Sequence, residues 1–482
     1  MSVIRFASAL AMVAALCGPS EAVEGTPPTE ATSDSAGAQE GPDGVPGPPA
    51  DLGELQRQIE NLTEEIAKLK GERTQEEGGA EDGAADLEEL RRQIQVLAEE
   101  VEKLRSGERR GVEITEDDAR TLGLAPSAAS LYGRDRGVSL AGYGEMLYES
   151  FASENESGEA TGGGAQADFL RAILYVGYRF SDRFLFNSEI EIEHADEIFL
   201  EFAYIDYLAT ENLGLRGGLL LLPMGLVNEF HEPNVFIGAR RPETEQRIIP
   251  TTWRENGLGV HGSAGKVAYR GYVVNGLRAS GFSASGIRGG RQKGSKARAD
   301  DLAFTGRLDV LPTPGVFVGA SVYTGGSGQG EVEVDGQSLE VRTTLFDLHG
   351  QAQVRGFDLR GLYARAWIDD AAALNQSLGL EGSDAVAETM LGGYVQLGYN
   401  VLSQVSSTRV SLLPYYRWER VDTQATMPPG YERSGATRRT LNTIGVEVKP
   451  IPNVVLKVDY QIVTNDAKTG RNQLNINLGY AF

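Results

Sequence analysis

Cysteine is almost missing from this chain, whose 482 residues contain only one, Cys17. That residue ends an apolar run, 6–17, which follows a basic start and precedes the small residues of 20–22. The pattern is typical of a secretory signal peptide, so we expect a signal over 1–22 that is cleaved after Ala22; the alternative is lipid modification of Cys17. A mature chain without cysteine excludes a disulfide framework, a thiol nucleophile and a cysteine-ligated zinc ion.

Long apolar stretches are missing as well. After residue 22 no run of about 20 apolar residues occurs, which excludes a membrane protein built of helices. The chain instead holds 60 glycines and 18 tyrosines, and only 41% of its residues are hydrophobic. This composition is unusual for a large soluble enzyme, and it suits a barrel with a polar inner face and a thin apolar outer band.

Residues that carry catalysis are sparse. The four histidines are far apart in the sequence, with no metal-ligand spacing; they are His194, His231, His261 and His349. His231-Glu232 lacks the second histidine of a metalloprotease helix, and 289–296 lacks the Gly-Lys-Ser/Thr end of a phosphate-binding loop. We therefore expect no enzyme, no cofactor and no metal site. The alternative, a barrel hydrolase, needs a nucleophile and a histidine at one rim.

The N-terminal quarter divides into three parts. Residues 23–50, rich in Pro, Gly, Ser, Thr and acidic residues, are expected to form a disordered leader. Over 51–106, apolar residues recur at spacings of three and four in two copies offset by 35 residues (87 − 52), which predicts a duplicated α-helical coiled-coil arm. The seam residues are Leu52, Leu55, Ile59, Leu62, Ile66, Leu69, Leu87, Leu90, Ile94, Leu97, Val101 and Leu104. Residues 107–136 are expected to be a linker, in which 115–118 can cap one brief helix.

From residue 137 onwards, apolar and polar residues alternate over short segments. In 473–482, leucine, isoleucine, tyrosine and phenylalanine alternate with glutamine, asparagine and glycine, and 454–462 has the same pattern. Such alternation predicts strands with one apolar and one polar face, which a soluble sandwich also shows. Strand lengths of about 9–11 residues and tyrosines near the strand ends favour a membrane-spanning barrel.

Turn lengths decide between these two folds. Short turns at 181–183, 263–265, 312–315, 355–356 and 450–453 alternate with long connections at 223–256, 277–300, 325–340, 369–386 and 421–438. Short turns on one rim and long loops on the other are typical of bacterial outer-membrane barrels. We predict an all-β fold over 137–482, a transmembrane antiparallel β-barrel of about sixteen strands in outer-membrane lipid, with the arm in the periplasm.

Two segments of the barrel region carry a family resemblance. The end of the chain, Leu478-Gly479-Tyr480-Ala481-Phe482, resembles the terminal signal read by the outer-membrane barrel assembly machinery, with Tyr480 and Phe482 as its key residues. The stretch 212–226, with its Pro-x-Gly turn at 223–225, resembles the phosphate-selective porin O and P family, and 312–316 is similar to the periplasmic turns of that family. The resemblance covers roughly 137–482. It implies a porin for passive diffusion of small hydrophilic or ionic solutes, among them anions such as phosphate.

The arm is expected to associate with identical copies, because its apolar stripe is too narrow for packing on its own domain. Isoleucine and valine at a with leucine at d favour two strands. Porin barrels of this size usually trimerise, so we expect a homo-oligomer, with a trimer favoured and a dimer left open. The alternative to a porin is a structural tether, whose barrel anchors an arm that reaches peptidoglycan. Neither function involves nucleic acid.

In the resembled family a long loop folds into the barrel, which makes 223–256 the candidate pore constriction. Its charged residues are Arg240, Arg241, Glu243, Glu245, Arg247 and Arg254. Opposed acidic and basic groups there would select ions by size and charge, with the arginines setting a mild anion preference. The alternative is an outer loop whose charges are only solvated.

Two further groups of charges bear on selectivity. A basic segment holds Arg288, Arg291, Lys293, Lys296 and Arg298. It either attracts anionic solutes or contacts the phosphates of lipopolysaccharide. In the predicted strand 184–192 and just beyond it, Glu189, Glu191 and Glu193 are expected to face the lumen, where they favour cations; the alternative is that they form only the wet face of a strand.

Overall fold

The computed structural model describes residues 115–133, 137–405 and 408–482. They belong to the second of two compact units, Val112–Phe482. The predicted signal peptide, leader and coiled-coil arm lie outside the described residues.

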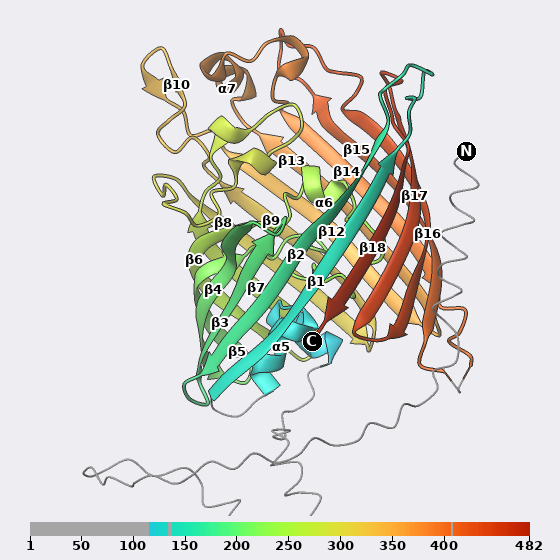
Figure 1. Cartoon of the computed structure of the whole chain (residues 1–482). Coiled ribbons are helices and arrows are strands. Elements are labelled where there is room, and N and C mark those ends of the chain that lie inside the picture. Colours follow the sequence, from blue (N-terminus) through green and yellow to red (C-terminus); the bar gives the residue numbers. More distant parts are fainter. Residues whose placement is uncertain (1–114, 134–136, 406–407) are drawn as a thin grey trace, which may run out of the picture. The chain divides into compact units, whose positions relative to one another are not determined.

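Within the described residues, sixteen antiparallel strands close into one barrel (Figure 1). Neighbouring strands pair in chain order, and β1 closes the barrel against β18, from Tyr143 opposite Ala481 to Phe151 opposite Gln473. The strands are β1 (Gly137–Phe151), β2 (Gly164–Arg179), β3 (Phe184–Glu193), β4 (Glu197–Thr210), β5 (Leu213–Leu221), β6 (Arg254–Ala264), β7 (Val267–Asn275), β8 (Leu302–Thr313), β9 (Val316–Gly325), β12 (Thr343–Val354), β13 (Phe357–Ile368), β14 (Thr389–Tyr399), β15 (Ser411–Thr426), β16 (Arg438–Ile451), β17 (Val454–Asn465) and β18 (Gln473–Ala481). A two-stranded hairpin, β10 (Glu333–Val334) and β11 (Gln337–Ser338), stands between β9 and β12. The predicted all-β barrel of about sixteen strands is confirmed.

Alternation along the strands separates an apolar outside from a polar inside. In β18, Asn475 and Asn477 are buried in the lumen, whereas Leu478 and Tyr480 are 43% and 37% exposed on the outer surface. The same alternation on the other strands produces an apolar outer belt, which is the surface that a barrel presents to hydrocarbon. No helix among the described residues is long and apolar enough to cross a membrane.

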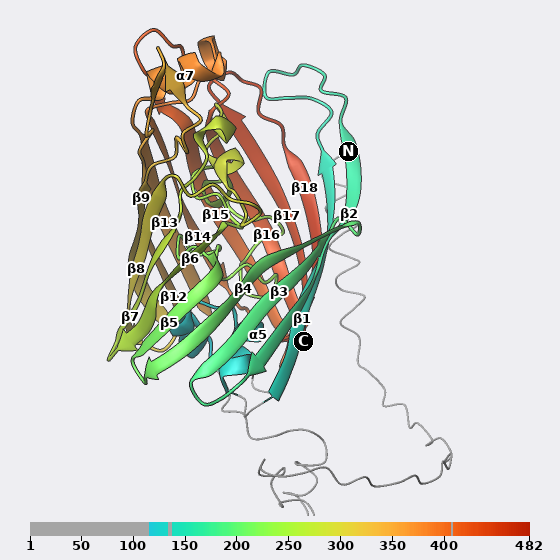
Figure 2. The same cartoon turned by 90° about the vertical axis from the view of Figure 1, so that its left-hand side faces the viewer.

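Most connections between strands sort by length to the two rims (Figure 2). The exceptions are the short turn 194–196, between β3 and β4, on the rim of the long connections, and the longer connection 400–410, between β14 and β15, on the rim of the short turns. The short turns are 180–183, 211–212, 265–266, 314–315, 355–356 and 452–453, and the long connections are 222–253, 276–301, 326–342, 369–388 and 427–437. Two long connections are shorter than predicted: the first ends earlier, because β6 already begins at Arg254, opposite Leu221, and the other begins later, because β15 continues to Thr426. Charged and polar residues at those strand ends join the backbone ladder, so no change in local polarity marks the boundary.

Short helices fill the connections and the barrel interior. Residues before β1 form α4 (Glu116–Leu122), α5 (Pro126–Ala129) and the 3-10 turn η1 (Ser130–Gly133), while the long connections hold η2 (Ala279–Gly281), η3 (Arg288–Gly290), η4 (Gly382–Asp384), α6 (Thr244–Arg247) and α7 (Ala371–Leu378). The predicted cap is confirmed: the Thr115 hydroxyl accepts from the Asp118 N–H at 3.1 Å, and the Asp118 carboxylate accepts from the Thr115 N–H. This reciprocal pairing satisfies two N–H groups that the first turn of α4 leaves free.

Candidate functional site

The longest connection, 222–253, crosses the interior of the barrel. It leaves β5, and its backbone N–H groups donate to carboxylates on strands of the facing wall. The three bonds run from Gly225 to Asp347 Oδ2 of β12 (3.1 Å), from Ala239 to Asp459 Oδ2 of β17 (2.7 Å) and from Thr244 to Glu419 Oε1 of β15 (2.6 Å). Bonds from charged acceptors to backbone N–H groups are among the stronger hydrogen bonds, so the loop is fixed along its length.

Glu245 holds the middle of this loop together. Its carboxylate accepts from the N–H groups of Leu226 and Val227 at 2.8 and 2.7 Å and from the Tyr394 hydroxyl at 2.6 Å. Loss of hydration on burial raises the pKa of Glu245 to about 7. Glu245, expected to act at a constriction, is thus an internal anchor of the loop.

The arginines expected at the constriction are distributed over two environments. Arg240 forms an ion pair with Glu149 of β1, and Arg247 pairs with Glu243 at 2.8 Å. Arg254 is buried and Arg241 half-buried: Arg241 lies 5.9 Å from the ring centroid of Phe236, and Arg254, on β6, lies 4.7 Å from that of Phe199. Burial, followed by repulsion from Arg171, lowers the pKa of Arg241. Only Arg240, Glu243 and Arg247 of this set reach the cavity described next.

A cavity of about 660 Å³ lies between the loop 222–253 and the connection 276–301. We call it the vestibule. Its charged lining residues are Arg240, Glu243, Arg247, Arg288, Arg291 and Lys293. Two groups of basic residues that the sequence separates by about forty positions therefore share one cavity, with five cations and one carboxylate in its lining.

The three cations from the connection 276–301 lack carboxylate partners. Within the described part of the chain, Arg288, Arg291 and Lys293 form no ion pair, and Arg291 donates to the carbonyl of Thr252 at 2.6 Å. Burial, and next repulsion from Arg241, lowers the pKa of Arg288 to about 10. Burial, and next repulsion from Arg288, lowers the pKa of Arg291 to about 9, and burial followed by repulsion from Arg291 lowers that of Lys293. Arg288 and Arg291 stay cationic at neutral pH, and the basic lining produces a positive potential that attracts anions.

The other basic residues of this connection lie outside the vestibule lining. Arg298 pairs with Asp300 at 2.8 Å and with Glu331 at 3.2 Å, and Lys296 is exposed. Of the basic residues expected to act together, three therefore line the vestibule, and Lys296 and Arg298 face solvent.

The carboxylates of β3 point into the barrel. Glu189 and Glu191 are 0% and 1% exposed, and Glu191 lies 3.2 Å from Arg171 of β2. Arg171 also pairs with Glu145 of β1 at 3.0 Å, and it lies 4.0 Å from Glu193. These acidic groups are held in a packed wall, so their charges are partly compensated.

Residues 115–133, which we call the plug, occupy the rim at which β1 begins (Figure 1). The plug binds wall and loop through three polar groups: Ser127 Oγ donates to Glu232 at 3.1 Å, Tyr132 donates to Asp206, and the Arg120 guanidinium lies 3.9 and 4.4 Å from the ring centroids of Phe317 and Phe230. Burial, followed by repulsion from Arg307, lowers the pKa of Arg120 to about 10. No pattern in the expected linker 107–136 predicts that part of it folds into the barrel.

Comparison with known proteins identifies one relative. No family model matches the chain. A protein of Aquifex aeolicus (strain VF5), described as uncharacterized, is 40% identical over 354 residues, which are 70% of this chain and 78% of the relative. The chain belongs to the family of this Aquifex protein. Membership of the phosphate-selective porin O and P family stays a prediction.

Solved structures similar to the present chain are outer-membrane barrels. They include OmpF of Salmonella typhi in complex with daunomycin (10% identity, TM-score 0.47, 72% of this chain and 98% of that one), the outer membrane channel DcaP of Acinetobacter baumannii (11%, 0.45, 72% and 97%) and OmpT of Vibrio cholerae in a trimer form (10%, 0.44, 72% and 100%). At these scores the likeness adds nothing to what the strand pairing already establishes.

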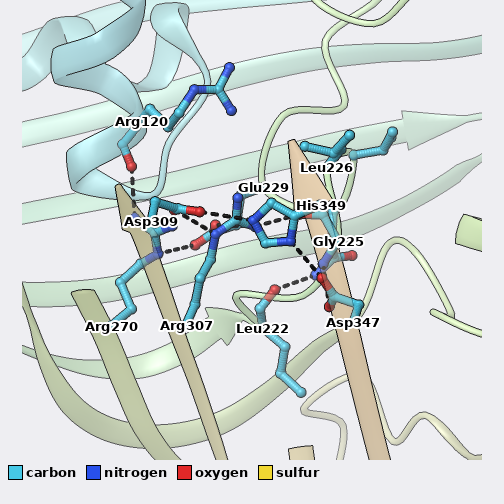
Figure 3. A network of polar contacts seen from close by, with 12 residues as sticks. Arg120, Leu222, Gly225, Leu226, Glu229, Arg270, Arg307, Asp309, Asp347 and His349 are labelled. Atoms are coloured by element: carbon cyan, nitrogen blue, oxygen red, sulfur yellow. Dashed lines mark hydrogen bonds and ion pairs between the residues drawn. The ribbon is translucent and has the colours of Figure 1, made fainter. Parts of the chain in front are cut away.

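A buried network joins barrel wall, loop and plug (Figure 3). At its centre, Asp309 of β8 accepts from Arg307 at 2.7 Å and from Arg270 at 2.9 Å. Arg307 donates to the carbonyl of Gly225 in the loop, and Arg270 donates to the carbonyl of Arg120 in the plug at 2.7 Å. One carboxylate thus positions both lumen segments through two arginines.

Replacing Asp309 with alanine is expected to destabilise the barrel by about 3 kcal/mol, because Arg270 and Arg307 would stay buried with Glu229, at 3.2 and 3.8 Å, as their remaining shared counter-ion. Urea unfolding of the protein in lipid vesicles measures the change. Asp300→Ala removes an exposed partner of Arg298 and is the control, with an expected change within about 0.5 kcal/mol. Equal midpoints for the two variants would contradict the role of Asp309.

The C-terminal residues lie on the outer surface. Phe482 is 64% exposed, and its N–H and carbonyl groups bond Gly142 of β1 at 2.8 and 2.9 Å. The Tyr480 ring covers Gly144, where a Cβ atom would stand 2.5 Å from the tyrosine oxygen. Both residues are accessible from outside the barrel, so their expected role in assembly stays a prediction.

Proposed function

We propose that this protein is a channel of the bacterial outer membrane that admits small hydrophilic solutes and prefers anions. The closed barrel with its apolar belt supports the membrane location, since a closed sheet leaves no unpaired backbone in lipid. The long connections would face the cell exterior, and both ends of the barrel sheet would face the periplasm, as in bacterial barrels with an even number of strands.

The observation that carries the anion preference is the lining of the vestibule. Five cations and one carboxylate surround a cavity large enough for a small hydrated solute, and three of those cations form no ion pair within the described residues. A cavity lined by one sign of charge and walled by low-dielectric protein concentrates ions of the opposite sign. A phosphate-like or carboxylate-bearing solute would gain several charge-assisted hydrogen bonds there.

Solutes would pass from the vestibule along the loop 222–253 and then beside the plug. Both segments are fixed to the wall by short hydrogen bonds, so the passage is narrower than the barrel itself. We therefore expect small conductance steps.

Reconstitution in planar bilayers tests the proposal. Refolded protein is expected to give stepwise currents, and a tenfold KCl gradient is expected to give a reversal potential of anion-selective sign. Heat-denatured protein is the control for leaks caused by detergent. A folded barrel that inserts and never conducts would refute the channel function, whereas cation-selective steps would refute only the anion preference.

The partners of the channel involve the arm, which lies outside the described residues, and two described segments of the barrel. We propose homo-oligomers joined through the arm, contact of the 276–301 connection with lipopolysaccharide, recognition of the last strand by the assembly machinery, and contact of the arm with peptidoglycan. Sedimentation of the isolated 51–105 peptide measures the first of these: replacing Ile59 and Ile94 with aspartate should leave it monomeric, because a charge does not pack at an a position.

A further inference from the structure

Three buried side chains meet at the point where the loop 222–253 passes β3 and β4. His231 Nε2 lies 3.4 Å from Glu189 Oε1 and 3.5 Å from Glu201 Oε2. One ligand atom from each residue lies within 4.8 Å of the others, and each residue is 2% exposed or less. The sequence separates His231 from the carboxylates by thirty positions or more, so no ligand spacing predicts this group.

The hydrogen bonds around His231 leave one ring nitrogen free to bind a cation. His231 Nδ1 lies 2.8 Å from the carbonyl oxygen of Asn228. Because a carbonyl only accepts, Nδ1 carries the proton, and in the neutral ring the lone pair of Nε2 points towards the carboxylates. Metal-binding histidines are commonly oriented in this way by a backbone carbonyl at the other nitrogen.

Three of the four carboxylate oxygens of Glu189 and Glu201 lack a hydrogen-bond donor among the described residues, and the fourth, Glu189 Oε1, accepts from the Tyr143 hydroxyl at 3.4 Å. The three are Glu189 Oε2 and both carboxylate oxygens of Glu201. Arg254 stays 3.9 Å from Glu201, and Arg171 pairs with Glu145 and Glu191 instead. Buried carboxylate oxygens without donors, facing a nitrogen lone pair, are costly unless a cation or a shared proton lies between them.

The distances favour a tetrahedral ion. Zinc binds histidine nitrogen and carboxylate oxygen at about 2.0–2.2 Å, which places neighbouring ligand atoms of a tetrahedron about 3.3–3.5 Å apart. The separations from His231 to Glu189 and Glu201 are 3.4 and 3.5 Å. An octahedral magnesium ion at about 2.0–2.1 Å needs ligand atoms about 3.0 Å apart, and it prefers oxygen ligands.

We propose that Glu189, Glu201 and His231 bind a divalent transition-metal ion of the zinc class, with one coordination position left for a further ligand. The ion links the loop 222–253 to the β3–β4 wall and neutralises two buried carboxylates. This site is independent of the proposed channel function, since the vestibule residues do not take part in it.

A second buried histidine provides a matched control. His349 also lies between two carboxylates, with Nδ1 2.6 Å from Asp347 and Nε2 2.8 Å from Asp309. Both of its ring nitrogens are engaged in short hydrogen bonds, and Asp309 is already paired with two arginines. No coordination position is left there, so His349→Gln is expected to leave metal binding unchanged.

The test uses full-length protein without a histidine tag, stripped with a chelator and titrated with Co²⁺, whose visible absorption is intense in tetrahedral sites. We expect one Co²⁺ per chain in the wild type and in His349→Gln, displaced by Zn²⁺. Glu201→Gln and His231→Gln keep the side-chain size and are expected to bind at least about tenfold more weakly. Circular dichroism and the electrophoretic mobility of unheated samples verify that each barrel is folded.

Two outcomes would overturn the proposal. The first is a folded wild-type chain that takes up no Co²⁺, which would mean that shared protons hold the group together. The second is a folded Glu201→Gln or His231→Gln variant with the wild-type spectrum and affinity. If neither variant folds, Glu189→Gln is tested in their place. The Co²⁺ spectrum and the number of ions bound per wild-type chain then show whether the site exists. Conductance of the stripped protein is recorded separately, so failure of the metal site leaves the channel test untouched.

Discussion

Deleting residues 115–133 is expected to raise the single-channel conductance several-fold. The plug occupies the rim at which β1 begins and is bound to the wall there by Arg270, by Asp206 and, through Glu232, by the loop. Access resistance at a pore mouth falls steeply as its cross-section widens, so removing two short helices changes the current more than removing single charges. Planar-bilayer recordings in symmetric KCl measure the change.

The control for this deletion removes 23–111 and keeps the plug, because the boundary between the two compact units lies after Gly111. We expect wild-type conductance from it. Gly123→Val gives an independent variant: Gly123 ends α4 at φ +68°, and a Cβ atom there would stand 2.5 Å from Glu229 Oε1. This variant should displace α4 and increase the conductance in part. Equal step sizes in the wild type and the plug deletion would mean that ions do not pass the plug.

The barrel was predictable because its sequence signal is local. A strand with one face in lipid and one in the lumen alternates with period two, and β18 shows the alternation from Gln473 onwards. The order of short turns and long connections added the second constraint, which fixed the rim of each loop. Strand ends were less accurate, because residues such as Arg254 pair in the ladder while their side chains have loop-like polarity.

The contents of the lumen were not predictable in the same way. The capping residues of α4 predicted a helix. Its residue Arg120, however, contacts Arg270 and Gln351, which lie 150 and 231 positions away in the sequence. The sequence placed the loops 222–253 and 276–301 on one rim and left open which of their charges face each other. Ion pairing with Glu149 and Glu243 offsets the positive potential of Arg240 and Arg247, and these contacts cannot be read from the periodicity of the sequence.

Neutralising Arg288, Arg291 and Lys293 together with glutamine is expected to abolish most of the anion preference. These three cations line the vestibule without ion pairs among the described residues, so each contributes its full charge to the solute path. Arg240 and Arg247 line the same cavity beside carboxylates, and their neutralisation should shift the reversal potential less. The sequence alone predicted that the arginines of 223–256 have the larger effect on anion preference. Comparing the reversal potentials of the Arg288, Arg291 and Lys293 variant and of the Arg240 and Arg247 variant shows which prediction is right.

The matched control is the pair Arg278→Gln and Arg298→Gln, which removes two cations of the same connection that are exposed and paired with Glu331. Reversal potentials in KCl gradients should stay at the wild-type value for this pair. The shift for the vestibule variant should grow as salt falls, because the Debye length increases from about 10 Å at 0.1 M to about 30 Å at 0.01 M. A phosphate gradient provides a second reading, since a divalent anion gains more from three unpaired cations than chloride does. If the vestibule variant keeps the wild-type reversal potential at low salt, permeating ions do not pass through this cavity, and the selectivity must arise elsewhere in the lumen.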